Sequence, residues 1–192
     1  MARPREFDTD EALQHATSVF WAKGFENASL DDLCEASGLN RSSLYAAFGD
    51  KRDLYLAALA RYEDGSAARI AAAFERRPVR KGLKAFLDAL IDSIAAGPGR
   101  RGCFIGNCAA EMAHLDRGTA ARVRRSLERI ETAFREGLEG ARARGEIARK
   151  SDPLALARFF TAGIQGLRLV GKANPDRAAL QDIARVMLRC LE

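Results

Sequence analysis

The sequence has few of the residues that build metal centres, hydrolytic sites and disulfide frameworks. Its 192 residues include only four cysteines and two histidines. The cysteines form no Cys-x-x-Cys pair and are widely spaced, at Cys34, Cys103, Cys108 and Cys190. A zinc site or a disulfide framework is therefore not expected, and we predict no metal and no cofactor.

Long apolar runs are also absent. No apolar run approaches the roughly 18 residues that a membrane-spanning helix requires. The first 16 residues carry early positive charge but lack the apolar stretch of a signal peptide. We therefore expect a cytoplasmic protein without a membrane partner.

Strand-forming residues are scarce as well. The chain holds 36 alanines against 5 valines, 8 isoleucines and 5 threonines, a ratio that favours helices over strands. Apolar periodicity, capping residues and prolines together predict an all-α fold of about nine helices. The predicted helices are 8–23, 30–37, 41–48, 51–77, 80–96, 103–115, 118–144, 153–170 and 176–191, and 97–102 is predicted to be a loop.

The charge is positive overall, but it is unevenly distributed. There are 31 Lys+Arg and 26 Asp+Glu, a net charge of +5, which permits a nucleic-acid partner without indicating one. Residues 1–52 hold six basic and nine acidic side chains, so this part of the chain is net acidic. Any affinity for nucleic acid must therefore come from the placement of the basic groups rather than from their sum.

Two short predicted helices, 30–37 and 41–48, flank the turn Gly38-Leu39-Asn40. This is the pattern of a helix-turn-helix, in which Gly38 supplies a positive φ. Ser29, with Asp32 three residues on, predicts the N-cap of the first helix. Apolar residues stand where the two helices must pack, at Leu33, Leu39 and Leu44.

The second helix of such a motif fits the DNA major groove and presents side chains to base edges. Helix starts and a basic arm before the first helix can hold phosphates or enter the minor groove. The candidate DNA-binding residues are Arg3, Arg5, Ser29, Arg41, Ser42, Ser43, Tyr45 and Lys51.

Residues 8–55 resemble the DNA-binding head of the TetR/AcrR family of bacterial transcriptional regulators. The matching stretches are Ala16 to Phe25, Ser29 to Leu33, and Gly38 to Lys51. The resemblance implies an all-helical homodimer with a DNA-binding head at 1–52 and a ligand-sensing, dimerising body at 53–192. It also implies phosphate contacts for Tyr45 and Lys51. Many members carry larger polar residues where this chain has Ala46-Ala47, which leaves fewer groups to read bases.

The last two predicted helices carry wide apolar surfaces. These surfaces suit either a monomer core or the four-helix dimer interface that the resemblance implies, whose two-fold symmetry matches a palindromic operator. The candidate interface residues are Leu167, Leu180, Ile183, Ala184, Met187, Leu188 and Leu191.

The resemblance further implies an effector cavity within the body, suited to a small molecule that is mostly apolar. Most of the apolar residues in this region are expected to be core, and some to line the cavity. The candidates are Phe86, Leu90, Phe104, Asn107, Cys108, Glu111, Met112, His114, Phe134, Phe160 and Gln165.

Two cysteines leave an alternative open. Cys103 is predicted at a helix N-terminus beside Arg100 and Arg101, an environment that favours a reactive thiol. Cys103 and Cys108 are therefore candidate redox sensors. The other interpretation is that both are small buried residues that fill space in the core. A disulfide between them would require the helix to unwind, because residues five apart face directions about 140° apart.

The sequence as a whole predicts a ligand-responsive DNA-binding regulator, and the resemblance favours a repressor released by a small effector. The two cysteines leave a thiol-reactive effector as one option. The alternative is an all-helical ligand- or partner-binding protein that does not bind DNA. We do not expect an enzyme. A nucleophile–base pair of Cys103 and His114 would be separated by about 16 Å along one helix.

Overall fold

The computed structural model describes residues 8–115 and 117–192, and these form nine α-helices and one short 3-10 helix. No strand occurs in these two ranges, which confirms the predicted all-α class. The elements are α1 (Thr9–Asn27), α2 (Leu30–Ser37), α3 (Arg41–Phe48), α4 (Lys51–Glu75), α5 (Val79–Ala95), η1 (Pro98–Arg101), α6 (Phe104–Met112), α7 (Arg117–Ala143), α8 (Pro153–Ala173) and α9 (Arg177–Arg189).

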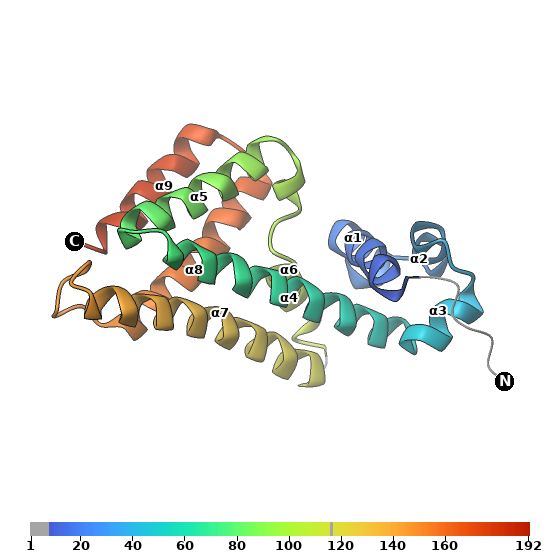
Figure 1. The fold of residues 1–192 in the computed structure, drawn as a ribbon. Coiled ribbons are helices and arrows are strands. Elements are labelled where there is room, and N and C mark those ends of the chain that lie inside the picture. The colour runs from blue at the N-terminus through green and yellow to red at the C-terminus, as the bar shows by residue number, and fades with distance from the viewer. Residues whose placement is uncertain (1–7, 116) are drawn as a thin grey trace.

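The helices are arranged around α4, the long helix that connects the two ends of the molecule (Figure 1). Helices α1 to α3 cluster at the end where α4 begins, and α7 runs alongside α4. At the other end α5 and α9 lie side by side, and α8 packs against α7. Within the described ranges, no helix is both long enough and apolar enough to cross a bilayer.

The helix boundaries in the first part of the chain follow local capping. Ser29 and Asp50 each form a reciprocal capping box, with Asp32 and Asp53 respectively, at the starts of α2 and α4. Gly38 ends α2 in the left-handed conformation, with φ 67°. These boundaries match the predicted ones because every capping partner lies within three residues.

Helix α1 differs from its prediction, which ended it at Gly24. The helical segment reaches Asn27, but the backbone at Gly24 is not helical (φ 80°, ψ 179°). A regular helix is therefore interrupted at the predicted residue, and a further short turn follows it.

In the body the predicted loop 97–102 contains the 3-10 helix η1. Helix α6 is shorter than predicted, and α8 continues three residues beyond its predicted end, to Ala173. The remaining body helices begin and end within two residues of their predicted positions.

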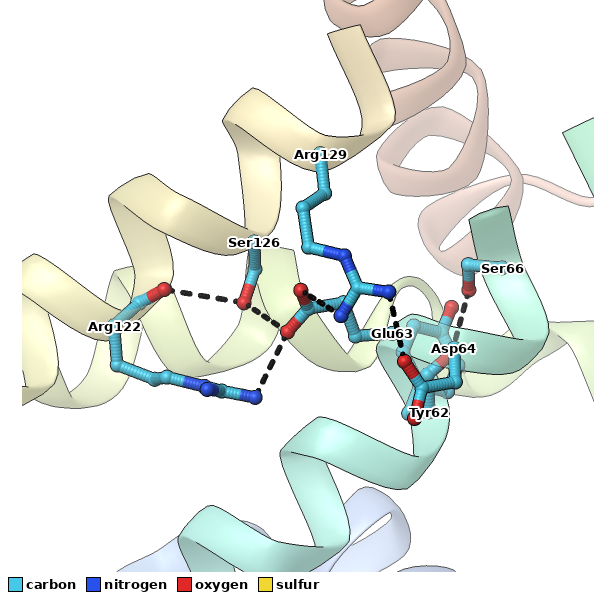
Figure 2. Close-up of polar contacts among 7 residues, drawn as sticks. All are labelled: Tyr62, Glu63, Asp64, Ser66, Arg122, Ser126 and Arg129. Carbon is cyan, nitrogen blue, oxygen red and sulfur yellow. Dashed lines mark hydrogen bonds and ion pairs between the residues drawn. The ribbon is translucent and has the colours of Figure 1, made fainter. Parts of the chain in front are cut away.

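A buried polar cluster joins α4 to α7 (Figure 2). The carboxylate of Glu63 on α4 is only 2% exposed. It accepts hydrogen bonds from Arg122 (3.0 Å), Ser126 (2.9 Å) and Arg129 (2.8 Å), all on α7. Because a buried charge is tolerated only when it is paired and hydrogen-bonded, this cluster specifies how α7 lies against α4.

Candidate nucleic-acid interface and effector site

The helix-turn-helix is held on α1 by apolar contacts. Leu33 and Leu44, one from each short helix, are almost completely buried together with Phe20 of α1. The side chain of Asn40 caps α3 by accepting a hydrogen bond from the backbone N–H of Ser43 at 2.8 Å. With Leu44 facing inward, the polar residues at the start of α3 are left facing outward.

The outward side of α3 carries the groups predicted to contact DNA. Arg41 and Ser42 are exposed, Ser43 is half-buried, and Tyr45 is 41% exposed. Arg41 lies 3.3 Å from Asp31, and both side chains are largely in solvent. An exposed ion pair of this kind contributes little stability, so Arg41 can exchange Asp31 for a phosphate or a base at small cost.

Lys51 and Ser29 lie at the starts of α4 and α2. The Lys51 ammonium lies 3.4 Å from the backbone carbonyl of Glu26 and 4.7 Å from the centroid of the Phe25 ring. The start of α4 therefore lies against the end of α1. Glu26, the residue that it contacts there, is three residues before Ser29. Free backbone N–H groups at helix starts attract anions.

The capping box of α2 includes a strongly acidic carboxyl. Hydrogen bonds from Lys23 and Ser29 lower the pKa of Asp32 to about 2. The Lys23–Asp32 contact measures 2.6 Å and links α1 to α2. Arg3 and Arg5, the predicted minor-groove arm, lie outside the described residues.

One contact between α6 and α1 was not predicted. The two carboxylate oxygens of Glu111 accept hydrogen bonds from the backbone N–H groups of Phe25 and Glu26, each at 3.0 Å. These donors lack helical partners because the helix is interrupted at Gly24. Glu111, predicted to line the effector cavity, joins α6 to the end of α1.

Aromatic rings reinforce this junction. The buried Tyr55 of α4 makes edge contacts with Phe20 and Phe25 of α1 and with Phe104 of α6, at centroid distances of 5.0, 5.2 and 5.3 Å. Burial raises the pKa of the Tyr55 phenol well above its usual range. These rings therefore pack α1, α4 and α6 into one buried aromatic cluster.

Few of the residues predicted to line an effector cavity lie together in one cavity. A cavity of about 450 Å³ lies between α1, α4, α5 and α8, and among the predicted residues Phe86 and Leu90 line it. Gln165 lines a smaller hollow beside it, together with Phe86. Trp21, Tyr62 and Arg168 were not predicted to line it, because they come from three different helices and no spacing along one helix brings them together.

The other predicted cavity residues lie elsewhere. His114 is exposed just after α6, and the amide of Asn107 donates to the carbonyl of Arg101 at 2.8 Å. Five residues belong to the buried core, where neighbouring helices fill the space around them: Phe104, Cys108, Met112, Phe134 and Phe160.

The cysteines are all free thiols. Cys103 is 6% exposed, at the N-cap of α6, and the hydroxyl of Tyr62 lies 3.7 Å from its sulfur. Cys108 is completely buried, and this burial raises the pKa of its thiol. The surroundings of Cys108 favour a structural role, whereas Cys103 borders the lining residue Tyr62.

The predicted dimer residues lie mostly inside one subunit. Six of the seven are buried within a single protomer, with exposures of 6% or less, because α8 and α9 pack against the rest of their own subunit: Leu167, Leu180, Ala184, Met187, Leu188 and Leu191. Only Ile183 retains partial exposure. The large apolar side chains of these helices that do reach solvent are Leu154, Phe159, Leu169, Val170 and Val186.

Within residues 8–115 and 117–192, no three His, Cys, Asp or Glu side chains are grouped closely enough to hold a metal ion.

Two family models match the chain. The model described as bacterial regulatory proteins, tetR family, matches residues 12–58. The model described as tetracyclin repressor-like, C-terminal domain, matches residues 78–187.

Individual relatives match over nearly the whole length. The chain is 32% identical to YezE of Bacillus subtilis, described as an uncharacterized HTH-type transcriptional regulator, over 100% of both chains. It is 35% identical to the HTH-type transcriptional repressor ComR of Escherichia coli, over 97% of this chain and 90% of ComR. A cysteine mutant of the TetR-family regulator CifR, solved with 26-base-pair operator DNA, superposes over 100% of both chains with a TM-score of 0.84 and 31% identity.

Proposed function

The chain belongs to the tetR family of bacterial regulatory proteins, and from this premise we propose that it is a ligand-responsive transcriptional regulator that binds a palindromic operator as a homodimer. The observation that carries the proposal is the outward-facing start of α3, held by a buried core and flanked by two helix N-termini. The family is one of regulators, and we propose no catalytic role.

Each exposed group has a distinct proposed role in DNA binding. Helix α3 would be the recognition helix, the one that enters the major groove. Its first residues, Arg41, Ser42 and Ser43, would contact bases. Phosphates would be contacted by Tyr45 and Lys51. Ser29 would offer its hydroxyl to a phosphate at the start of α2. Because bacterial operators lie in the cytoplasm, the proposed function puts the protein in that compartment.

We propose that it represses and is released by an effector, as the name of its relative ComR, a repressor, supports. Residues 1–52 would form the DNA-binding head and 53–192 the sensing and dimerising body. Exposed apolar residues of α8 and α9, such as Phe159 and Val186, would pack against the second subunit.

The proposed mechanism uses the junction between head and body. An effector that binds one packing of the body more tightly would shift α6 and α4, and the Glu111 carboxylate would transmit this shift to α1. Operator binding requires the two recognition helices to lie about 34 Å apart, one turn of DNA. A change in that separation releases the operator.

The direct test measures binding to duplexes from the promoter next to its own gene, by fluorescence anisotropy over a range of salt concentrations. Lys51→Ala should weaken binding to all sequences and reduce the salt slope by about 0.9, the value for one phosphate contact. Arg41→Ala should relax sequence preference at a cost of about 1–3 kcal/mol. Lys84→Ala, which removes an exposed charge of α5 paired with Asp88, serves as the control and should change neither.

The competing function is an all-helical ligand- or partner-binding protein without DNA affinity. The acidic head and the small Ala46-Ala47 pair are the features that favour it. If no duplex, the adjoining promoter included, shows salt-dependent binding, this alternative replaces the regulator.

A thiol-reactive effector is a separate option within the proposal. Operator release after treatment with hypochlorite or a quinone should be lost in Cys103→Ser if that thiol is the sensor, while Cys108→Ser should behave as wild type. Equal release in both variants and the wild type would exclude sensing at these two sites.

A further inference from the structure

The cavity between α1, α4, α5 and α8 has a one-sided charge. Its lining includes the arginines Arg61, Arg69 and Arg168 and no aspartate or glutamate. Arg61 is engaged elsewhere, since it pairs with Asp10 and donates to Gln14 of α1. The other two arginines decide the chemistry of the cavity.

Arg69 and Arg168 have no carboxylate partner among the described residues. The half-buried Arg168 donates to the hydroxyl of Tyr62 at 2.7 Å and to the carbonyl of Gly102 at 3.5 Å, and Arg69, which is exposed to solvent, donates to the hydroxyl of Ser66 at 3.1 Å. The Nε of Arg168 is buried and has no hydrogen-bond partner within residues 8–115 and 117–192. Neutral hydroxyls do not neutralise a guanidinium, and a buried N–H without an acceptor is costly.

Tyr62 cannot supply the missing negative charge. Burial, together with the adjacent Cys103, raises the pKa of its phenol to about 12, although Arg168 acts in the opposite direction. The phenol therefore stays neutral at physiological pH and holds Arg168 in place without neutralising it.

The rest of the lining combines apolar and aromatic side chains with the uncharged polar residues Gln14, Thr17, Ser18 and Ser93. Trp21 of α1 and Phe86 and Leu90 of α5 present hydrocarbon surface to the same cavity. Its volume of about 450 Å³ is that of an ordinary small-molecule site. Arginine side chains recognise carboxylates and phosphates through paired hydrogen bonds, and these charge-assisted bonds are about twice as strong as bonds to a neutral acceptor.

We propose that this cavity is the effector site and that it binds an amphipathic organic anion, whose carboxylate or phosphate pairs with Arg168 and Arg69 while its apolar body lies on Trp21, Phe86 and Leu90. This inference rests on the proposed function and specifies the class of effector. Because Trp21 belongs to the head helix α1 and Arg168 to the body helix α8, the bound anion bridges the two parts.

The test uses the single tryptophan of the chain as a reporter inside the cavity. The full-length protein, without DNA, is titrated with octanoate, 4-phenylbutanoate and octyl phosphate, and with the neutral octanamide and 4-phenylbutanamide. At least one anion should change Trp21 fluorescence saturably and bind at least tenfold more tightly than its amide. Preference for octanoate or octyl phosphate identifies the anionic group.

Variants test the role of the guanidinium groups. Arg168→Gln should weaken anion binding at least tenfold and leave amide binding unchanged, with circular dichroism showing that the fold is retained. Arg69→Gln, which removes a guanidinium that donates to Ser66, provides a second variant if Arg168→Gln does not fold. Arg158→Gln removes a charge from the same helix at an exposed pair with Glu131 and should bind anions as the wild type does.

Three results would overturn the inference: no saturable change with any anion, equal affinity for acids and amides, or an equal loss in Arg158→Gln and Arg168→Gln. Operator binding is measured separately without ligand. If the protein binds its operator but no anion, only the proposed class of effector is disproved. If it binds anions but no duplex, the proposed function as a DNA-binding regulator is disproved.

Discussion

Two glycines show how differently the head and the body are specified. Gly38, in the turn between α2 and α3, has φ 67°, and a Cβ added there would meet nothing within 4 Å. Gly82, in α5, has no such backbone requirement, but a Cβ there would overlap the carbonyl oxygen of Ala73 at the end of α4. Gly38 is required because its backbone has a positive φ. Gly82 is required because helix α4 leaves no room for a side chain.

The same difference runs through the two regions. Caps and turns within a few residues set the boundaries of α2 and α3, whereas the body depends on contacts between helices far apart in sequence, such as Glu63 with Arg122 and Arg129. Substitutions should therefore be more costly at the body's helix contacts than at the head's turns.

The largest effect is expected at Gly82. Gly82→Ala should lower the free energy of unfolding by about 3 kcal/mol, because the new methyl group meets backbone that cannot move without separating α4 and α5. Urea unfolding measures this loss. Gly140→Ala is the matched control, since its methyl group meets only the flexible guanidinium of Arg144. A comparable loss of stability in Gly140→Ala would contradict the explanation that the clash with the α4 backbone causes the loss in Gly82→Ala.

The next effect is expected at the buried carboxylate of α4. Glu63→Ala should cost about 2–3 kcal/mol, because two arginines and Ser126 lose a buried acceptor. The neighbouring Asp64 also pairs with Arg129, at 2.9 Å, but is 67% exposed, so Asp64→Ala should cost under about 0.5 kcal/mol. Equal midpoints for the two variants in urea would contradict the role assigned to burial.

A smaller effect is expected at the turn of the head. Gly38→Ala should cost about 1 kcal/mol, the penalty for a side chain in the left-handed conformation, with no added clash. Thermal unfolding gives the loss. A cost equal to that of Gly82→Ala would show that the two regions are not specified differently.

The smallest effect is a titration at the start of α2. Asp32 has a pKa of about 2 in the folded chain against 3.8 as its ordinary value. Because the folded pKa is the lower one, its stabilising contribution is complete above about pH 4 and is lost as the pH falls through 2. NMR should find the carboxyl midpoint near pH 2, and in Lys23→Ala it should rise toward 3.8; an unchanged midpoint would exclude Lys23 as the main cause.

The sequence predictions are accurate where structure depends on neighbouring residues and less accurate where it depends on contacts between distant helices. Helices α2 and α3 begin and end at the predicted residues because Ser29, Gly38 and Asn40 act on their immediate neighbours. Most of the predicted cavity and dimer residues are buried within a single subunit. Periodicity identifies an apolar face, but it does not say whether that face meets its own subunit, a ligand or a partner.

Glu111 illustrates this limit. Its position on a short helix of the body suggested a ligand-binding group, yet its carboxylate accepts two backbone N–H groups of α1. Nothing near residue 111 in the sequence indicates that Gly24, far earlier, would leave those donors free.

The sequence by itself determined the all-α class, the helix-turn-helix and the order of the helices, because helix propensity, capping and turn chemistry act over a few residues. Only the tertiary structure decided which apolar residues are buried, which carboxylate joins head to body, and that Arg69 and Arg168 share a cavity without an acidic partner. Those outcomes depend on distances between segments far apart in the chain, and hydrophobic packing, which has no directional preference, leaves many such arrangements open until the whole core is assembled.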